Sequence, residues 1–271
     1  MLLKKSLFII LYILPIVVYA QQGTNDSLTK KNLYNADTLK NASFRPLAFV
    51  APVALVAYGG LSFAVHPIRR VDYFVASQIH KSNPSFNTQA ETYFMFTPIA
   101  LVYGLNLAGV QGKNNFADRS AILVLSAGFM GVSTELTKHL THRLRPNQQN
   151  NQSFSSGHAA FAFMGAEFLA QEYDDRSPWF GVLGYSIGAA TGVFRLYNRE
   201  HWLSDVVTGA GYGIISTKLA YFIYPTVKRW FIPHDHHAGN FNSGKKSMFS
   251  NTMLMPGIQN GNPSFSFSTN F

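Results

Sequence analysis

Apolar stretches of helix length dominate the chain between residues 46 and 224 and limit what it can fold into. There are six of them, near residues 47–65, 93–110, 120–136, 157–169, 179–194 and 205–224. Most have about 15 to 20 residues, the length of a buried or a membrane-spanning helix. Helices joined by short connections pack as antiparallel neighbours. The sequence therefore predicts an all-α fold, an antiparallel bundle of about six core helices.

A further helix is expected between the first two stretches. Residues 68–81 distribute basic, aromatic and aliphatic side chains in an amphipathic pattern. Such a helix suits a membrane surface, and it equally suits the cover of a bundle, so both interpretations stay open. Residues 82–89, which follow it, are expected to form a loop.

The two ends of the chain differ in composition from its middle. Residues 1–20 carry Lys4 and Lys5, then an apolar run, then the small residue Ala20, which is the pattern of a cleaved export signal. Residues 21–45 are polar and predict a flexible lead-in, while residues 46–230 predict the helical domain. Residues 231–271 are a C-terminal tail, with two short runs (247–255 and 263–271) around Gly257, Asn260 and Gly261 that predict a small β-hairpin or a loose tail.

Charge and residue types exclude several function classes. The formal net charge of +9 suits an anionic membrane surface or an acidic substrate, whereas the scattered basic residues argue against nucleic acid. The chain has no cysteine and therefore no disulfide. The three histidines within residues 234–237 lack a fixed fourth ligand, so we expect a solvated turn there and no metal site. Without a Gly-rich phosphate loop or a Gly-x-Ser-x-Gly elbow, nucleotide binding and serine hydrolysis are not expected.

The sequence leaves two settings open for the bundle. Pro52 and Pro98 interrupt the first two stretches, and Glu167 would cost about 2.5 to 3.5 kcal/mol if it lay unpaired at the centre of a bilayer. A soluble bundle avoids that cost if Glu167 has a partner or water. We expect an inner-membrane protein of a bacterial envelope whose site faces the periplasm, and the alternative is a soluble periplasmic bundle.

Basic residues that suit an oxyanion interrupt the apolar sequence at helix boundaries. Arg145 and Arg195 carry planar, permanently charged forks that match two oxygens of a phosphoryl group, and Lys138 adds a compact charge. Basic residues beside apolar helices are also common in the headgroup layer and in water. Their conjunction with the histidines described next is what predicts an anion site.

Two histidine-containing groups accompany the basic residues. Ser156, Gly157 and His158 begin the fourth stretch, where one of the two serines before Gly157 would cap the helix and free N–H groups would face an anion. His201 and Asp205 are four residues apart, so they share a helix face and the carboxylate can orient the ring. A ring held in one tautomer keeps its other nitrogen free for attack.

In these residues the chain resembles the type 2 phosphatidic acid phosphatase (PAP2) superfamily, which also contains bacterial acid phosphatases and vanadium haloperoxidases. The family pattern is Lys, six residues and Arg-Pro; then Pro-Ser-Gly-His; then Ser-Arg, five residues, His, three residues and Asp. The matching residues, in chain order, are Lys138, Arg145, Pro146, Ser156, Gly157, His158, Arg195, His201 and Asp205. Ser155 stands where the family has Pro, and Phe194 stands where it has Ser.

The resemblance, which covers residues 90–224, implies a mechanism as well as a helical fold. His201 would attack phosphorus and form a phosphohistidine, Asp205 would orient its ring, and His158 would protonate the leaving oxygen. The other matched residues would hold the phosphate oxygens: Lys138, Arg145, Ser156, Gly157 and Arg195. No metal and no other cofactor is expected.

The implied substrate is a phosphomonoester or diphosphate of an envelope lipid, such as phosphatidate, phosphatidylglycerophosphate, undecaprenyl diphosphate or the phosphate of lipid A. A soluble periplasmic acid phosphatase of broad specificity is one alternative. A vanadium-dependent haloperoxidase, with vanadate on His201, is another. A structural envelope protein that kept the pocket by descent is a third.

Overall fold

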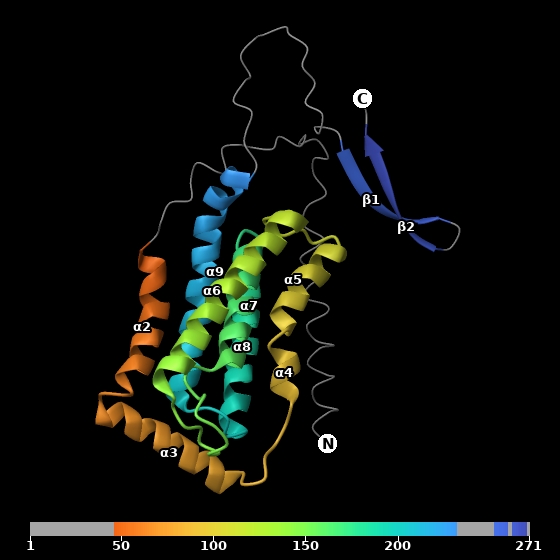
Figure 1. Cartoon of the computed structure of the whole chain (residues 1–271). Coiled ribbons are helices and arrows are strands. Elements are labelled where there is room, and N and C mark those ends of the chain that lie inside the picture. Colours follow the sequence, from red (N-terminus) through yellow and green to blue (C-terminus); the bar gives the residue numbers. More distant parts are fainter. Residues whose placement is uncertain (1–45, 232–251, 260–261, 270–271) are drawn as a thin grey trace. The chain divides into compact units, whose positions relative to one another are not determined.

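The computed structural model describes residues 46–231, 252–259 and 262–269. Helices build the first of these segments (Figure 1). They are α2 (Leu47–Leu61), α3 (His66–Ser82), α4 (Ala90–Phe94), α5 (Thr97–Leu107), α6 (Phe116–Thr141), α7 (Gly157–Tyr173), α8 (Trp179–Tyr197) and α9 (Leu203–Phe231). The predicted helical bundle is confirmed. The predicted export signal, the polar lead-in and the histidines of residues 234–237 lie outside the described residues.

The second apolar stretch forms two helices rather than one. α4 ends at Phe94, and α5 begins at Thr97 with Pro98 in its first turn. Proline has no N–H group and disfavours helical geometry in the residue before it, so it is accommodated at the start of a helix. Pro52, in contrast, lies inside α2 without ending it.

The amphipathic segment forms α3, which turns by 89° from α2 and crosses one end of the bundle (Figure 1). Asp72 is 1% exposed and faces the protein, whereas Tyr73 and Phe74 are exposed. α3 therefore covers the bundle, as one of the two interpretations expected. It also presents aromatic side chains outward, which agrees with the other interpretation.

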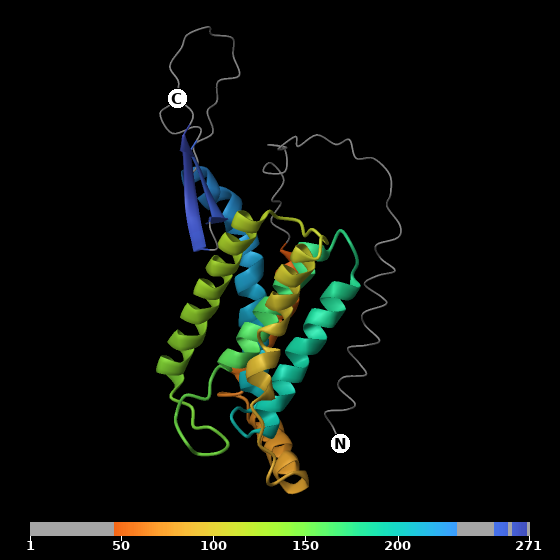
Figure 2. The ribbon, with the colours of Figure 1, turned by 90° about the vertical axis from the view of Figure 1, so that its right-hand side faces the viewer.

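The core gathers around α7, which packs against α5, α6 and α8. Figures 1 and 2 show α6, α8 and α9 running along the length of the bundle, with α6 and α8 on opposite sides of it in Figure 2. The side chains of the largest buried cluster come from four helices; they are Val102, Ile122, Phe168, Leu169, Tyr173 and Ala220. This packing gives the site loops at the helix ends a rigid support.

Glycine lets α9 lie unusually close to α7. A Cβ atom on Gly213 would come within 2.2 Å of the Ala160 carbonyl oxygen and 2.6 Å of the Met164 backbone nitrogen. The hydroxyl of Thr217 donates to the Met164 carbonyl at 3.0 Å across the same contact. Only a residue without a side chain fits at position 213 without moving one of the two helices.

The structure identifies the partners of Glu167, which could not be named from the sequence. Its Oε1 accepts hydrogen bonds from Lys218 Nζ (2.7 Å) and from Gln171 (2.8 Å), and its Oε2 accepts one from the Tyr185 hydroxyl. A buried carboxylate that is paired with a cation and hydrogen bonded avoids most of the cost of burial. Glu167 is therefore compatible with a helix in an apolar environment.

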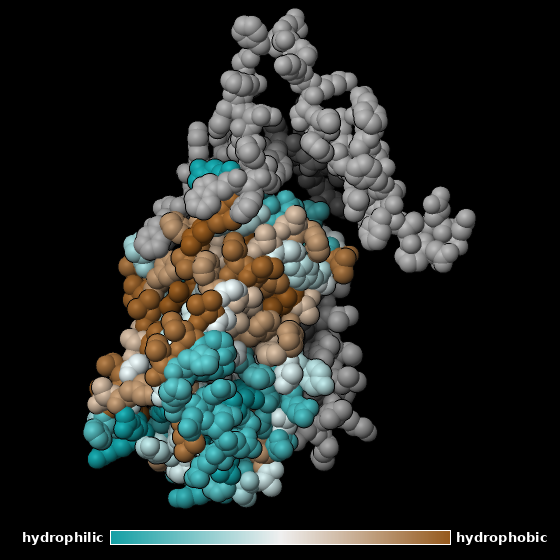
Figure 3. All heavy atoms as spheres, viewed as in Figure 1, coloured by the Kyte–Doolittle hydropathy of each residue, from teal (hydrophilic) through white to brown (hydrophobic). Residues whose placement is uncertain are grey.

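Two helices are long and apolar enough to cross a membrane, or up to three if the bent pair α2 and α3 counts as one. They are α6 and residues 203–229 of α9, among the described residues. Apolar side chains on α6 such as Val124 (69% exposed) and Val132 (68% exposed) have no protein cover. In Figure 3, hydrophobic residues cover the middle of the bundle and hydrophilic residues gather at the end where α3 lies.

The C-terminal hairpin is a separate unit, since the chain divides into compact units that meet between Lys228 and Arg229. Strands β1 (Thr252–Gln259) and β2 (Asn262–Thr269) pair antiparallel, with Thr252 opposite Thr269 and Gln259 opposite Asn262. The predicted β-hairpin is therefore found. Of the three residues expected between the two runs, Gly257 lies within β1 opposite Ser264, because the pairing continues to Gln259, and residues 260 and 261 lie outside the described residues.

Candidate active site

Three segments that carry the predicted motifs meet at the pole of the bundle that α3 crosses (Figure 1). They are the loop after α6 (residues 142–156), the start of α7 and the connection between α8 and α9 (residues 198–202). The Asn147 N–H donates to the Arg199 carbonyl and the Ser156 N–H to the Asp205 carbonyl, both at 3.1 Å. Hydrogen bonds thus join all three segments that carry the predicted motifs.

The loop after α6 turns back at once toward the α8–α9 connection. His142 lies in the left-handed region with a φ of 45°, and its N–H donates to the Lys138 carbonyl at 3.2 Å. The indole N–H of Trp202 donates to the Leu144 carbonyl at 2.8 Å. These contacts fix the backbone on both sides of Arg143.

Ser156 caps α7, as the sequence predicted for this position. Its hydroxyl accepts from the Ala159 N–H at 3.4 Å, and its φ and ψ of −71° and 109° are extended. The N–H groups of Gly157 and His158 belong to the same first turn, and helix geometry directs them past the helix end, where an anion is stabilised. The Ser156 N–H itself is engaged by the Asp205 carbonyl.

The ring of His201 has its Nδ1 2.7 Å from the carbonyl oxygen of Ser153. A carbonyl only accepts, so Nδ1 carries the proton and Nε2 has its lone pair free. Asp205, which was expected to orient this ring, has its Oδ2 farther from Nδ1, at 3.8 Å, so the Ser153 carbonyl is the nearer acceptor. Burial lowers the pKa of His201, which is 3% exposed, and so favours the neutral ring.

Asp205 is fully buried and held from three sides. Its Oδ2 accepts hydrogen bonds from the Ser153 hydroxyl (2.5 Å) and the Trp202 N–H (2.9 Å), and its Oδ1 lies 2.7 Å from Nη1 of Arg143. A carboxylate with this many donors is held in one orientation. Asp205 therefore acts on His201 as a fixed negative charge beside the ring, and Ser153 binds both.

Arg145 and Arg195 come together on one carboxylate. Nη1 of Arg145 forms an ion pair with Oε2 of Glu200, and Nη2 of Arg195 lies 3.4 Å from the same oxygen. Arg195 is also held by Glu91, whose Oε1 is 3.0 Å from its Nη1. Two guanidinium groups that reach one oxygen form a clamp for an oxyanion. Glu200 thus sits where such an anion would be stabilised.

Each arginine of this clamp also has a buried donor without a partner. The Nε atoms of Arg145 and Arg195 are buried and have no hydrogen-bond partner among the described residues, and the same holds for the hydroxyl of Ser155. A buried donor left unpaired costs about 1 to 3 kcal/mol. An oxyanion that entered the clamp could satisfy these donors, which is a feature that a purely structural ion-pair network lacks.

Lys138 reaches the start of α7 from the last turn of α6. Its Nζ lies 3.7 Å from the point where a Cβ atom on Gly157 would be placed, and it also pairs with Glu135 Oε1 at 2.7 Å. The ammonium group therefore lies beside the N-terminal turn of α7, where an anion would also be stabilised by the helix dipole.

Burial lowers the pKa of His158 to about 4, with further contributions from Arg195, His201, Arg145 and Lys138. Electrostatic effects of this kind fall off with distance, so they also place His158 among the four groups that the motifs predicted. Without an anion, His158 is neutral near pH 7. A bound phosphate adds negative charge, raises the pKa of His158 and so favours uptake of a proton.

The two departures from the family pattern have different surroundings. Ser155 is fully buried directly before the cap of α7. Phe194 packs against Phe86 (ring centroids 6.4 Å apart) and Phe94 (5.6 Å). An aromatic cluster thus takes the place of the serine hydroxyl and attaches the loop of residues 83–89 to the end of α8.

Sequence reasoning missed several residues that shape this site. Arg143 and Glu200 stand next to predicted residues in the sequence, Arg143 two positions before Arg145 and Glu200 directly before His201. Their spacing was a usable signal. The other missed residues gave none: Asp72 and Glu91 lie far away in the chain, and Ser153, three positions before Ser156, contacts His201 through its backbone carbonyl.

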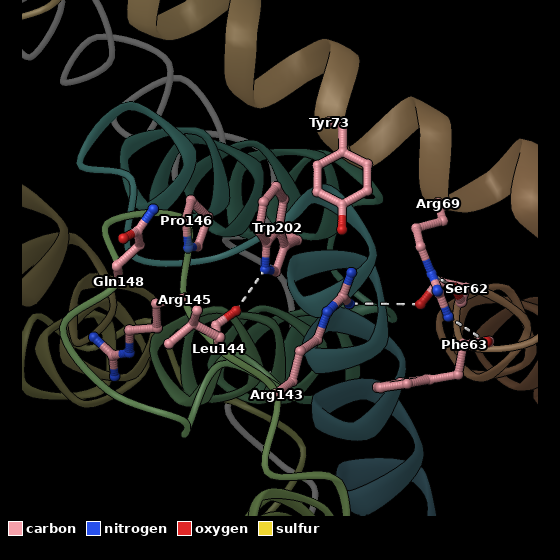
Figure 4. Close-up of a pocket in the computed structure, with 10 residues that line it drawn as sticks. All are labelled: Ser62, Phe63, Arg69, Tyr73, Arg143, Leu144, Arg145, Pro146, Gln148 and Trp202. Carbon is pink, nitrogen blue, oxygen red and sulfur yellow. Dashed lines mark hydrogen bonds between the residues drawn. The ribbon is translucent and has the colours of Figure 1, made fainter.

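A pocket of about 370 Å³ lies beside the clamp, between the α2–α3 corner and the loop after α6 (Figure 4). Its lining residues are Ser62, Phe63, Arg69, Tyr73, Arg143, Leu144, Arg145, Pro146, Gln148 and Trp202. In Figure 4 the guanidinium group of Arg145 points away from the rings of Tyr73 and Trp202. The pocket and the clamp are therefore neighbours on opposite sides of the loop.

Comparison with known proteins gives one family and a small number of relatives. Residues 119–229 match the model of the PAP2 superfamily. The lipid A 1-phosphatase of Porphyromonas gingivalis is 33% identical over 146 residues, which cover 54% of this chain and 33% of that protein. The aligned part of the chain thus spans about a third of the length of this curated relative.

Two solved structures are also similar. The crystal structure of Aquifex aeolicus LpxE matches with a TM-score of 0.41 and 19% identity, over 54% of this chain and 93% of that chain. A transmembrane PAP2 type phosphatidylglycerolphosphate phosphatase from Bacillus subtilis matches with a TM-score of 0.46 and 20% identity, over 66% of this chain and 98% of that chain. The family match on residues 119–229 includes all three motifs, from Lys138 to Asp205. Over this segment, the chain is similar to the PAP2 superfamily.

Proposed function

We propose that this protein is a metal-independent phosphatase that removes phosphate from an envelope lipid through a phosphohistidine on His201. The observation that carries the proposal is the state of the His201 ring. Its Nδ1 N–H donates a hydrogen bond to the Ser153 carbonyl, so its Nε2 has a free lone pair and is available as a nucleophile. The arginine clamp, with its unpaired buried donors, supports an oxyanion as the target.

In the first step, Nε2 of His201 attacks phosphorus and the bond from phosphorus to the leaving oxygen breaks. The ring becomes positively charged while Nδ1 keeps its proton, and the nearby carboxylate of Asp205 stabilises that charge. Arg145, Arg195 and Lys138 hold the phosphoryl oxygens, on which charge is concentrated. Most of the acceleration then comes from positioning and electrostatics rather than from covalent chemistry by the protein.

His158 supplies the proton that the leaving oxygen needs. It takes this proton up when the phosphate binds, because the anion raises the pKa that burial has lowered to about 4. After the alcohol leaves, neutral His158 accepts a proton from the water that attacks the phosphohistidine. Inorganic phosphate is released, and His201 returns with its Nε2 lone pair free.

The substrate class we propose is a lipid-borne phosphate at a membrane surface. Candidate spanning helices and an apolar belt support a membrane setting, and the charged groups gather at one pole of the bundle. The relative from Porphyromonas gingivalis is named for the phosphate at position 1 of lipid A, so this lipid is the first to test. We further propose that the protein lies in the inner membrane with this pole facing the periplasm.

The test is release of inorganic phosphate by the full chain in detergent, measured on lipid A, phosphatidate, phosphatidylglycerophosphate and undecaprenyl diphosphate. Wild-type protein is expected to hydrolyse at least one of these lipids, and His201→Ala to show no turnover above background. His139→Ala is the matched control, because His139 is an exposed histidine in the last turn of α6, and it is expected to keep wild-type activity. A His201→Ala protein with wild-type turnover would contradict the assignment.

A further inference from the structure

The strongest unassigned feature near the site is a buried charge network that begins on α3. Asp72 of α3 is 1% exposed, yet it has no part in the chemistry described above. Its Oδ2 lies 2.7 Å from Nη2 of Arg143, and Nη1 of the same guanidinium lies 2.7 Å from Oδ1 of Asp205. One arginine thus bridges two buried carboxylates that are 133 positions apart in the sequence, at 72 and 205.

We infer that Arg143 and Asp72 are positioning residues, which keep Asp205 charged and oriented beside His201 and so couple α3 to the reacting centre. This inference rests on the proposed function. Neither residue touches the reacting atoms in it, so their effect passes through Asp205.

The electrostatic argument starts from the burial of Asp205, which is fully buried. A buried carboxylate is costly unless a cation and hydrogen bonds compensate it. Arg143 is the only cation that forms an ion pair with Asp205 besides the His201 ring, among the described residues. Without Arg143, Asp205 would lose its charge partner in the step that makes the His201 ring positive.

Asp72 fixes the direction in which Arg143 points. With Nη2 bound to Asp72, the planar guanidinium presents Nη1 toward Asp205, toward the Ser204 hydroxyl at 2.7 Å and toward the Ser62 hydroxyl at 3.5 Å. The rings of Phe63 and Trp202 lie 5.2 Å and 5.6 Å from its central carbon and enclose it further (Figure 4). The orientation of Arg143 is therefore set on every side that the structure describes.

Asp72 also binds the first turn of α9 directly. Its Oδ1 accepts from the Ser204 N–H at 2.9 Å, and its Oδ2 accepts from the Ser204 hydroxyl at 2.6 Å. A carboxylate at a helix N-terminus satisfies free N–H groups and complements the helix dipole. Because His201 precedes this turn and Asp205 lies in it, a shift of α3 would move both.

The experiment measures kcat and KM of the full chain in detergent, on the lipid phosphate that gives the highest wild-type rate. The variants are Asp72→Asn, Arg143→Gln and the double variant, with Arg70→Gln as the matched control on the exposed side of α3. For each single variant we expect kcat to fall about tenfold or more, the scale for groups one contact away from a reacting centre. KM and the inhibition constant of inorganic phosphate should stay within about threefold, because the anion clamp is intact.

The double variant separates coupling from independent damage. If Asp72 acts through Arg143, the double variant loses no more kcat than Arg143→Gln alone. The inference is overturned if both single variants keep wild-type kcat, or if their losses of kcat multiply in the double variant. It is also overturned if kcat, phosphate affinity and the thermal midpoint fall together, as they would after general unfolding. A wild-type protein without turnover on any lipid phosphate contradicts the proposed function instead.

Discussion

At the scale of single residues, the site is defined by where protons and charges are fixed before a substrate arrives. The backbone carbonyl of Ser153 accepts a hydrogen bond from Nδ1 of His201, and the Asp205 carboxylate adds a fixed charge near the ring. On the other side, Glu200 neutralises part of the charge of Arg145 and Arg195. The ligand-free site is therefore a set of ion pairs, and phosphate has to compete for two of them.

Replacement of Glu200 tests that competition. Glu200→Gln removes the negative charge of a carboxylate whose Oε2 contacts both arginines. The inhibition constant of inorganic phosphate should therefore fall by about three- to tenfold, which corresponds to roughly 1 kcal/mol of binding free energy. Competitive inhibition of lipid phosphate hydrolysis gives the constant. Asp174→Asn serves as the control, since Asp174 pairs with Lys113, which has no part in the clamp, and is 53% exposed. Weaker inhibition of Glu200→Gln would mean that Glu200 organises the clamp instead of competing with the substrate.

The lowered pKa of His158 predicts the pH dependence of anion binding. In the free protein this pKa is about 4, and in the complex the anion raises it, so the complex binds a proton that the free site does not. Between these two pKa values the affinity should fall as pH rises, by up to about tenfold per unit. Sulfate is the suitable probe because its charge is constant over this range. In His158→Gln the slope should decrease, and an equal slope would assign the proton to another group.

Sequence reasoning reached the site residues whose spacing is fixed within one motif, and it stopped where partners come from elsewhere. Arg195, His201 and Asp205 could be named from their spacing within one motif, but the expected shared helix face is not found, because His201 precedes α9 and only Asp205 lies in that helix. Asp72 could not, because its role depends on how α3 packs across the pole. Nor could the tautomer of His201 be assigned to a backbone carbonyl, since no sequence pattern marks one.

At the scale of elements, α7 and α9 form the frame that holds the site. α7 presents its N-terminal turn to the anion, and α9 begins directly behind His201. The two helices approach so closely at Gly213 that backbone meets backbone. The distance between His201 and the N-terminus of α7 therefore depends on small residues in this contact.

Substitution of Gly213 measures how much this approach matters. Gly213→Ala places a methyl group 2.2 Å from the Ala160 carbonyl oxygen, so we expect a loss of about 1 to 3 kcal/mol in the free energy of unfolding. Gly128→Ala is the control, because a Cβ there meets nothing within 4 Å, and it should stabilise α6 by about 0.5 to 1 kcal/mol. Thermal unfolding in detergent compares the two. Equal midpoints would show that the α7–α9 contact tolerates the methyl group.

Most elements could be predicted from apolar length and helix start signals, and the exceptions have identifiable causes. The break between α4 and α5 required weighing Pro98 against an otherwise continuous apolar run. The 89° turn between α2 and α3 has no strong sequence marker. Pro67 in the first turn of α3 is compatible with a helix start, but it does not specify the direction in which the new helix runs. Such corners are decided by packing.

At the scale of the whole helical unit, polarity is divided between a belt and a pole. Exposed apolar side chains such as Leu107 (91% exposed) and Phe116 (71% exposed) lie away from α3, and hydrophilic residues gather near it (Figure 3). Burying such a belt in a bilayer removes apolar surface from water. The arrangement leaves the charged pole at the interface, where a lipid headgroup would be presented.

A membrane setting makes a prediction about extraction. The protein should stay with the membrane pellet after an alkaline carbonate wash and should be released by detergent, because candidate spanning helices resist a wash that removes surface-bound proteins. Release by osmotic shock or by carbonate would favour the soluble periplasmic alternative.

The central claim, that His201 is the nucleophile of a phosphatase, is tested most directly by trapping its covalent intermediate. The wild-type protein is mixed with lipid phosphate, quenched in alkali, where phosphohistidine survives, and digested for mass spectrometry. Our account predicts one phosphoryl group on the peptide that contains His201, and more of it in His158→Gln, where hydrolysis of the intermediate is slowed. A phosphoryl group on another residue, or turnover without any labelled peptide in either protein, would contradict it.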